Sequence, residues 1–111
     1  MTDQHKKYLS DIDLAIELIE EFTSSIADFE EYCSDLKTQS AVERQLSIIG
    51  EAVNKYEKLS PESTLDNARK IVGFRNRLIH TYDAIDNSIV WAIIKKHLGP
   101  LKTEISKKLY Q

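Results

Sequence analysis

Apolar residues recur at three- and four-residue spacing along almost the whole chain, which is the pattern of amphipathic helices. Near the N-terminus this pattern predicts a helix over about residues 5 to 23, with an apolar face made of Leu9, Ile12, Ile16, Ile19 and Phe22. Ser25 followed by Asp28 resembles a helix N-cap with an acid in the first turn. We therefore predict a short second helix carrying Ile26, Phe29 and Tyr32. One uninterrupted helix to about residue 36 is the alternative.

The strongest periodicity runs from about residue 37 to 59. Its main stripe consists of Val42, Leu46, Ile49, Val53 and Tyr56, and it is widened by Ala41, Ile48, Ala52 and Leu59. Gly50 lies within this stripe, where glycine costs about 1 kcal/mol relative to alanine, so we expect a close helix contact there. Ser60 and Pro61 mark the end of this helix and the start of the next, with Pro61 in its first turn.

A further helix begins near residue 65 and continues to about residue 82. Its apolar positions are Leu65, Ala68, Ile71, Phe74 and Leu78. Residues 83–86 read as a loop, with Asp86 as the N-cap of a last helical segment that carries Val90, Ile93, Ile94 and Leu98. Gly99 and Pro100 are expected to kink or break this segment before Leu101, Ile105 and Leu109 resume it.

These elements predict an all-α fold, an antiparallel bundle of four main helices plus short extra helical segments. The length of 111 residues suits a single domain over residues 1–111. No window approaches the roughly 18 consecutive apolar residues of a membrane span, and the first seven residues lack the apolar run of a signal peptide. We therefore expect a cytoplasmic protein that makes no membrane contact.

Charge is unevenly distributed along the chain. The net charge of −3 argues against indiscriminate binding to nucleic acid. Residues 67–82, however, carry four cations and no acid, whereas the first third is acidic. An anion such as RNA would therefore be met by the cations of this segment, which are Arg69, Lys70, Arg75 and Arg77.

Two kinds of chemistry are excluded or disfavoured. Cys33 is the only cysteine, so no intramolecular disulfide can form, and its acidic neighbours disfavour a reactive thiolate. His5, His80 and His97 are far apart in sequence, and no two of them share a helical face with a carboxylate at ligand spacing. We expect no metal site and no cofactor.

The segment with chemical potential contains Arg75, His80 and Tyr82. Histidine titrates near neutrality and can act as general base or acid, and the arginine fork suits phosphate oxygens. The pair suits metal-free transesterification of RNA, in which the 2′-hydroxyl attacks the adjacent phosphate. On a regular helix, however, Arg75 and His80 lie roughly 140° apart. Either the helix ends near His80, or a second copy of the helix completes the site.

Taken alone, these residues also fit a plainer interpretation. A single arginine and histidine on one helix are more often a solvated face or a hydrogen-bonded surface pair. Tyr82, which follows a core stripe, is usually a residue at the edge of a core.

A family resemblance changes this balance. The chain resembles the HepT toxins of the HEPN superfamily of helical ribonucleases in its R-x4-H-x-Y motif. Arg75, His80 and Tyr82 occupy the three named positions of that motif. Residues 48–52 (IIGEA) resemble the helix that precedes the motif in that family, and Val90 with Trp91 falls where a similar pair is common. The likeness extends from about Leu9 to Leu109. One departure is the segment 65–68 (LDNA), where the family often has a tryptophan, so the motif helix is expected to pack differently.

The resemblance implies a homodimeric, metal-independent endoribonuclease that is the toxin of a type VII-like toxin–antitoxin pair. Arg75 would bind the phosphate and His80 would act as base or acid where two motif helices meet. Supporting roles fall to Asn76, beside the arginine, and to Arg77 and Glu51. The implied partner is an MntA-like nucleotidyltransferase antitoxin, which would transfer AMP to Tyr82 and so block the cleft.

Two other functions are compatible with the sequence. The first is a non-catalytic HEPN module that binds RNA or nucleotide, or that serves only as the regulatory partner of a nucleotidyltransferase. It predicts salt-dependent anion binding without a cleavage product. The second is a purely structural helical dimer, for which Arg75→Ala would affect stability alone.

Overall fold

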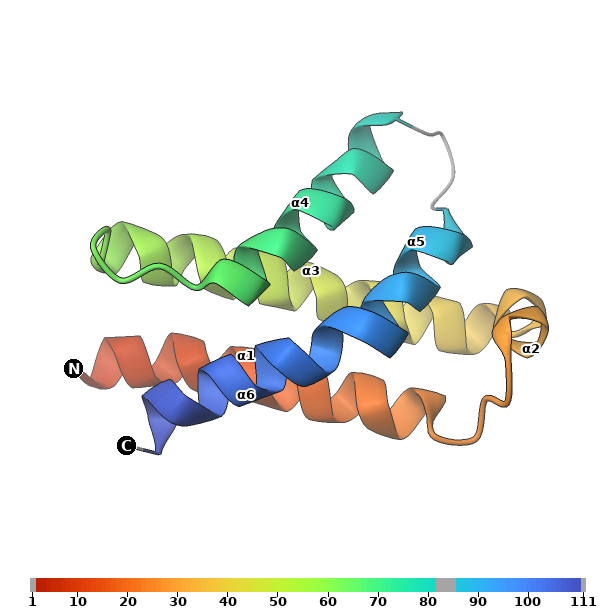
Figure 1. The fold of residues 1–111 in the computed structure, drawn as a ribbon, viewed down its shortest axis with the longest axis horizontal. Helices are drawn as coiled ribbons and strands as arrows, with labels where there is room; N and C mark the ends of the chain where they lie inside the picture. Colours follow the sequence, from red (N-terminus) through yellow and green to blue (C-terminus); the bar gives the residue numbers. More distant parts are fainter. Residues whose placement is uncertain (1, 82–85, 111) are drawn as a thin grey trace.

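The computed structural model describes residues 2–81 and 86–110, and for residues 75–81 it describes the backbone only. In these ranges all regular structure is helical, which confirms the all-α fold. The elements are α1 (Asp3–Thr23), α2 (Phe29–Ser34), α3 (Leu36–Leu59), α4 (Asp66–Thr81), α5 (Asn87–Ala92), the π-helical turn η1 (Ile93–His97) and α6 (Leu98–Leu109). Figure 1 shows that α1 runs antiparallel to α3 and to α6.

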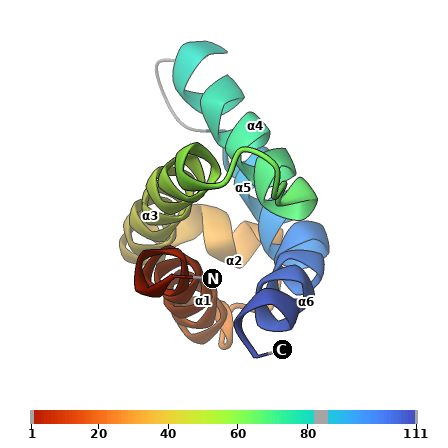
Figure 2. The ribbon, with the colours of Figure 1, turned by 90° about the vertical axis from the view of Figure 1, so that its left-hand side faces the viewer.

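The core lies between α1, α3 and α6, and α2 closes its far end beside α3 and α5 (Figures 1 and 2). The predicted apolar stripes supply its centre, and the residues with no exposed surface include Ile12, Ile16, Ile19, Val42, Ile49, Leu101 and Ile105. Gly50 is buried in the same stripe of α3. The first helix begins slightly earlier than predicted because Thr2 caps it: its hydroxyl accepts from the His5 N–H in a capping box.

The second helix exists, but its predicted cap is wrong. Asp28 is the N-cap of α2, in extended backbone, and its carboxylate accepts from the Glu31 N–H at 2.9 Å. Ser25 lies three residues upstream, so Ile26 is buried outside the helix. The carboxylate of aspartate is among the best N-capping groups, and Asp35 repeats the device for α3, accepting from the Thr38 N–H at 3.0 Å. The single helix to residue 36 is thereby excluded.

Two predictions about proline need correction. α3 ends at Leu59 as expected, but the next helix begins only at Asp66, so Pro61 lies in a turn and not in a first helical turn. Gly99 and Pro100 lie inside the first turn of α6, and the irregularity comes before them, in η1.

The π-helical turn has a physical cause in Pro100. Proline has no N–H to donate, and in a regular α-helix its ring crowds the carbonyl four residues earlier. The chain widens here instead: the N–H of Leu98 donates to the carbonyl of Ile93, five residues back. Figure 1 shows α5, η1 and α6 as one curved rod along the core.

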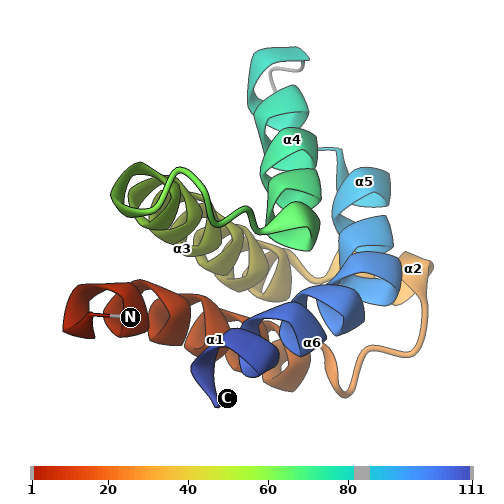
Figure 3. The same cartoon turned by 60° about the vertical axis from the view of Figure 1, so that its left-hand side comes forward.

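α4 leaves the bundle. Its first turns pack near α3 and α6, and its last turns rise away from the layer formed by α1 and α3, in all three views (Figures 1, 2 and 3). Among the side chains of α4 that the structure describes, which end at Phe74, Ala68 and Ile71 are buried, and so is Leu65 just before the helix. Among the described helices, none is long and apolar enough to span a membrane.

Candidate functional site

The second half of α4 carries the predicted catalytic segment. The positions of Arg75, Asn76, Arg77 and His80 all lie on this helix, whose backbone is helical through Thr81. The helix therefore does not end before His80, and the rotation of roughly 140° between Arg75 and His80 remains. Tyr82 and the predicted loop 83–85 lie outside the described residues.

Helical register separates α4 into two stripes. Position 75 follows the buried stripe of Leu65, Ala68 and Ile71, one turn beyond Ile71. Positions 69, 73, 76 and 80 follow another stripe, since spacings of four, three and four residues return to nearly the same side. Arg75 and His80 thus occupy positions on different sides of one helix.

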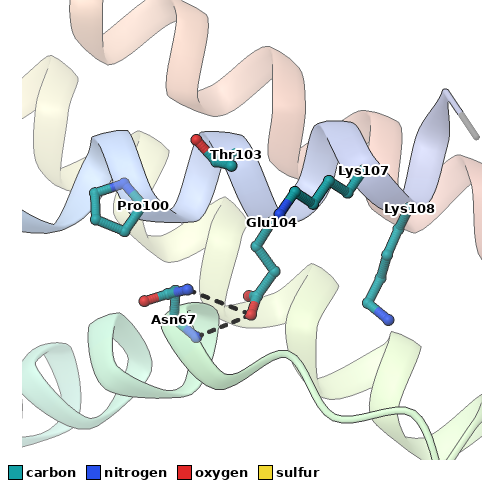
Figure 4. A pocket seen from close by; sticks show the side chains of 6 residues that line it. All are labelled: Asn67, Pro100, Thr103, Glu104, Lys107 and Lys108. Carbon is teal, nitrogen blue, oxygen red and sulfur yellow. Dashed lines mark hydrogen bonds between the residues drawn. The ribbon is translucent and has the colours of Figure 1, made fainter.

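The start of α4 is held by a residue from α6. The residue preceding the helix is Leu65, which has no side-chain acceptor, so the first N–H groups of α4 need another partner. Glu104 supplies it: its carboxylate accepts from the backbone N–H of Asn67 at 3.3 Å and of Ala68 at 3.3 Å, and its Oε2 lies 3.4 Å from the Asn67 side-chain nitrogen (Figure 4). An apolar residue at a cap position signals a missing partner, but the sequence does not say which residue replaces it.

A cavity of about 550 Å³ adjoins this contact. It is lined by Asn67, Pro100, Thr103, Glu104, Lys107 and Lys108 (Figure 4). The cavity lies at the opposite end of α4 from His80. Its carboxylate, that of Glu104, already accepts hydrogen bonds from the start of α4. It therefore belongs to the anchoring of α4 and not to the candidate catalytic segment.

The two predicted RNA-binding cations outside the motif differ in setting. Arg69 lies between α3 and α4, with its Nε 3.2 Å from Oε2 of Glu57. Lys70 is exposed. Glu51 is exposed on α3, and its supporting role stays a prediction because the side chains of Arg75 and Arg77 lie outside the described residues. A described ion pair between α3 and α4 joins Arg69 to Glu57. Sequence reasoning did not identify Glu57, since an isolated helical glutamate carries no signal.

The other two histidines take part in packing. The His5 ring meets Tyr56 edge-on at 5.6 Å and hydrogen-bonds the Ser60 hydroxyl. The His97 ring lies 4.9 Å from that of Phe74, immediately before Arg75, and so ties η1 to α4. Both are placed to stabilise helix contacts.

A comparison with protein families identifies the chain. The model of the family described as "Ribonuclease HepT-like" matches residues 12–107. The chain belongs to the HepT-like family. This confirms the resemblance seen in R-x4-H-x-Y, since the match includes Arg75, His80 and Tyr82.

Individual proteins similar to this HepT-like chain support the same family and fold. A Thermococcus cleftensis protein named "Probable ribonuclease HepT" is 43% identical over 111 residues, covering 96% of this chain and 97% of that protein. A similar fold is found in the solved structure of a tri-AMPylated HEPN toxin of Shewanella oneidensis in complex with an MNT antitoxin, with a TM-score of 0.69, 23% identity and full coverage of both chains. The chain therefore has the HEPN fold.

Proposed function

We propose that this HepT-like protein is the toxin of a type VII-like toxin–antitoxin pair and a metal-independent endoribonuclease. The observation that carries the proposal is the position of Arg75 and His80 on the half of α4 that stands clear of the bundle, in a chain of the HepT-like family. A long, flexible substrate such as RNA can reach a helix in that position without any rearrangement of the core.

The proposed reaction is transesterification by the 2′-hydroxyl. The 2′-oxygen bonds to phosphorus, the bond from phosphorus to the 5′-oxygen breaks, and a 2′,3′-cyclic phosphate remains. His80 takes the proton of the 2′-hydroxyl or gives one to the leaving 5′-oxygen. Arg75 stabilises the negative charge that develops on the phosphoryl oxygens.

Other residues support this reaction in the proposal. Asn76 and Arg77 position the phosphate, and Glu51 orients an arginine of the motif. Arg69 and Lys70 attract the RNA backbone.

Each protomer supplies half of the proposed catalytic site. Because Arg75 and His80 lie on different sides of α4, one helix does not aim both at a single phosphate. A homodimer, in which two α4 helices meet at their projecting ends, brings two arginines and two histidines into one cleft. The stripe of α4 that passes through Ile71 continues beyond the bundle through positions 75 and 78, which such a partner would cover.

The proposed antitoxin is an MntA-like nucleotidyltransferase that transfers AMP to Tyr82. The solved Shewanella oneidensis toxin is described as tri-AMPylated and bound to an MNT antitoxin. An anionic phosphodiester on Tyr82, two residues after His80, would occupy the cleft and engage the cations that RNA needs. We expect both partners to act in the cytoplasm.

The test is RNA cleavage in the presence of EDTA, with analysis of the product ends. We expect 2′,3′-cyclic phosphate ends from the wild type and a loss of about 10²- to 10⁴-fold in rate for His80→Ala, with unchanged helical content. Lys55→Ala, an exposed change on α3, serves as control. Salt-dependent RNA binding without product would favour the alternative, a non-catalytic HEPN module, and wild-type cleavage by His80→Ala would contradict the mechanism.

A further inference from the structure

A small groove lies between α3 and α4, on the stripe of α4 that leads to His80. It has a volume of about 230 Å³ and is lined by Val53, Asn54, Glu57, Arg69, Val72 and Gly73. Its volume is below the roughly 300–1,000 Å³ of sites for drug-sized ligands, so it suits a group of the size of one planar ring system. Val72 gives it apolar surface, since Val53 is only 1% exposed, and Asn54, Glu57 and Arg69 give it polar groups.

The two charged residues of the groove hold each other. The Nε of Arg69 lies 3.2 Å from Oε2 of Glu57. The Glu57 side chain is 22% exposed, and its Oε2 is shielded from solvent and makes no hydrogen bond of good geometry within the described residues. Arg69 therefore lies against the shielded oxygen of this carboxylate, and a ligand in the groove meets only the exposed part of the Glu57 side chain. The Arg69 side chain is 63% exposed, so other parts of it stay accessible from solvent.

Gly73 leaves the groove open. A Cβ atom built at this position would meet no atom within 4 Å, so the glycine is not required by helix packing. Positions 76 and 80 follow Gly73 along the same stripe of α4, and position 80 lies about 10 Å further along the helix axis. The open space thus adjoins the proposed catalytic positions on the same side of the helix.

We propose that this groove is a subsite for one nucleobase next to the scissile phosphate, and that it selects bases with an exocyclic amino group. The inference rests on the proposed ribonuclease function. The face of the base packs on Val72, the exposed part of the Glu57 side chain accepts an N–H of the amino group, and Arg69 contacts the RNA backbone. Guanine, adenine and cytosine offer an amino group to the carboxylate, whereas uracil has none and flanks its single N3–H with two carbonyl oxygens that the carboxylate repels. Unpaired bases offer these edges in single-stranded RNA.

The first experiment fills the groove. Gly73→Ala places a methyl group where nothing is touched, and Gly73→Leu places a side chain in the space that the base would take. Binding is measured by fluorescence anisotropy with short 2′-O-methyl oligouridylates that carry one guanosine at each position in turn. These probes have no free 2′-hydroxyl, so the measurement does not depend on cleavage. We expect a guanosine preference of about tenfold at one position, retained by Gly73→Ala and lost by Gly73→Leu.

The second experiment removes either the donor or the acceptor of the proposed hydrogen bond between the base and Glu57. Inosine differs from guanosine only by the missing amino group, so replacing guanosine by inosine should weaken wild-type binding about tenfold. In Glu57→Met, of similar shape but without an acceptor, the two probes should bind equally. Lys55→Ala, one residue after Asn54 and exposed on α3, should keep the wild-type preference.

The outcomes separate the subsite from the ribonuclease. Equal binding of guanosine and inosine probes by the wild type, or an unchanged preference in Gly73→Leu, overturns the subsite even if RNA is cleaved. A preference that disappears in Glu57→Met supports the subsite even if no RNA is cleaved, a result that would count against the proposed catalysis alone.

Discussion

Glu104 and Asn67 lie 37 residues apart in sequence, yet the carboxylate of one caps the helix that begins beside the other. The contact fixes the start of α4 on α6, and the projecting half of α4 then follows from helical geometry. The direction of the candidate catalytic segment is therefore set at the opposite end of its helix.

Removal of this cap should destabilise the protein. We expect Glu104→Ala to lower the free energy of unfolding by about 1 kcal/mol, within the usual range for a lost N-cap, as measured by urea denaturation. Lys107→Ala, an exposed neighbour on α6, should change it by less than about 0.5 kcal/mol. An equal effect of the two substitutions would show that the cap contributes nothing specific.

Two buried tyrosines provide a matched pair. The Tyr32 hydroxyl is buried without a hydrogen-bond partner among the described residues, and burial raises the pKa of this phenol, with a further contribution from the Glu43 charge. The Tyr56 hydroxyl lies 3.0 Å from the Ser63 hydroxyl. We expect Tyr32→Phe to raise the free energy of unfolding by up to about 1 kcal/mol and Tyr56→Phe to lower it by about 1 kcal/mol. Thermal and urea unfolding would measure both changes. A loss of stability in Tyr32→Phe would show that the Tyr32 hydroxyl makes a stabilising hydrogen bond after all.

Acid should weaken the start of α5. Hydrogen bonds from the Ser88 side chain and backbone to Asp86 lower the pKa of this carboxyl. The folded state thus binds the proton less readily than the unfolded chain, so the stabilisation is present above the unfolded pKa of about 3.9 and is lost as pH falls through the folded pKa. Asp86→Asn keeps a capping side chain without a titrating group. The stability difference between neutral pH and about pH 3 should be smaller in this variant than in the wild type, and an unchanged difference would contradict the role of Asp86.

Mixing wild-type and His80→Ala protomers tests the proposed composite site. If one cleft needs both histidines, random pairing makes the rate of RNA cleavage fall as the square of the wild-type fraction. A self-sufficient protomer gives a linear decrease. The two proteins are mixed under conditions that allow subunit exchange, and a linear plot would refute a cleft that needs both histidines.

Co-expression with the cognate nucleotidyltransferase tests the proposed silencing. We expect the wild type to gain the mass of at least one adenylyl group and to lose RNA cleavage, whereas Tyr82→Phe should gain none and remain active. Intact-mass spectrometry and the cleavage assay give the two measurements. Adenylylation of Tyr82→Phe to the wild-type extent would place the modification on another residue.

Periodicity predicted most helices because burying an apolar stripe is the main source of helix stability in a small domain. The bounds predicted for α1 and α3 differ from the observed ones by no more than two residues, and Asp86 caps α5 as expected. The errors lie where local alternatives compete: Asp28 replaced Ser25 as a cap, and Pro100 was accommodated by a π-helical turn before it. These choices depend on backbone geometry that the hydrophobic pattern does not encode.

The sequence by itself determined the helical class, the family and the candidate residues Arg75, His80 and Tyr82, because each depends on residue identity and spacing along the chain. Only the tertiary structure decided that Glu104 anchors α4, that Glu57 and Arg69 share a groove, and that the motif half of α4 stands away from the bundle. Those features join residues distant in sequence, and helix packing, not helical periodicity, brings such residues together. The segment Arg75 to His80 is therefore a property of the sequence, while the direction of the helix half that carries it is a property of the fold.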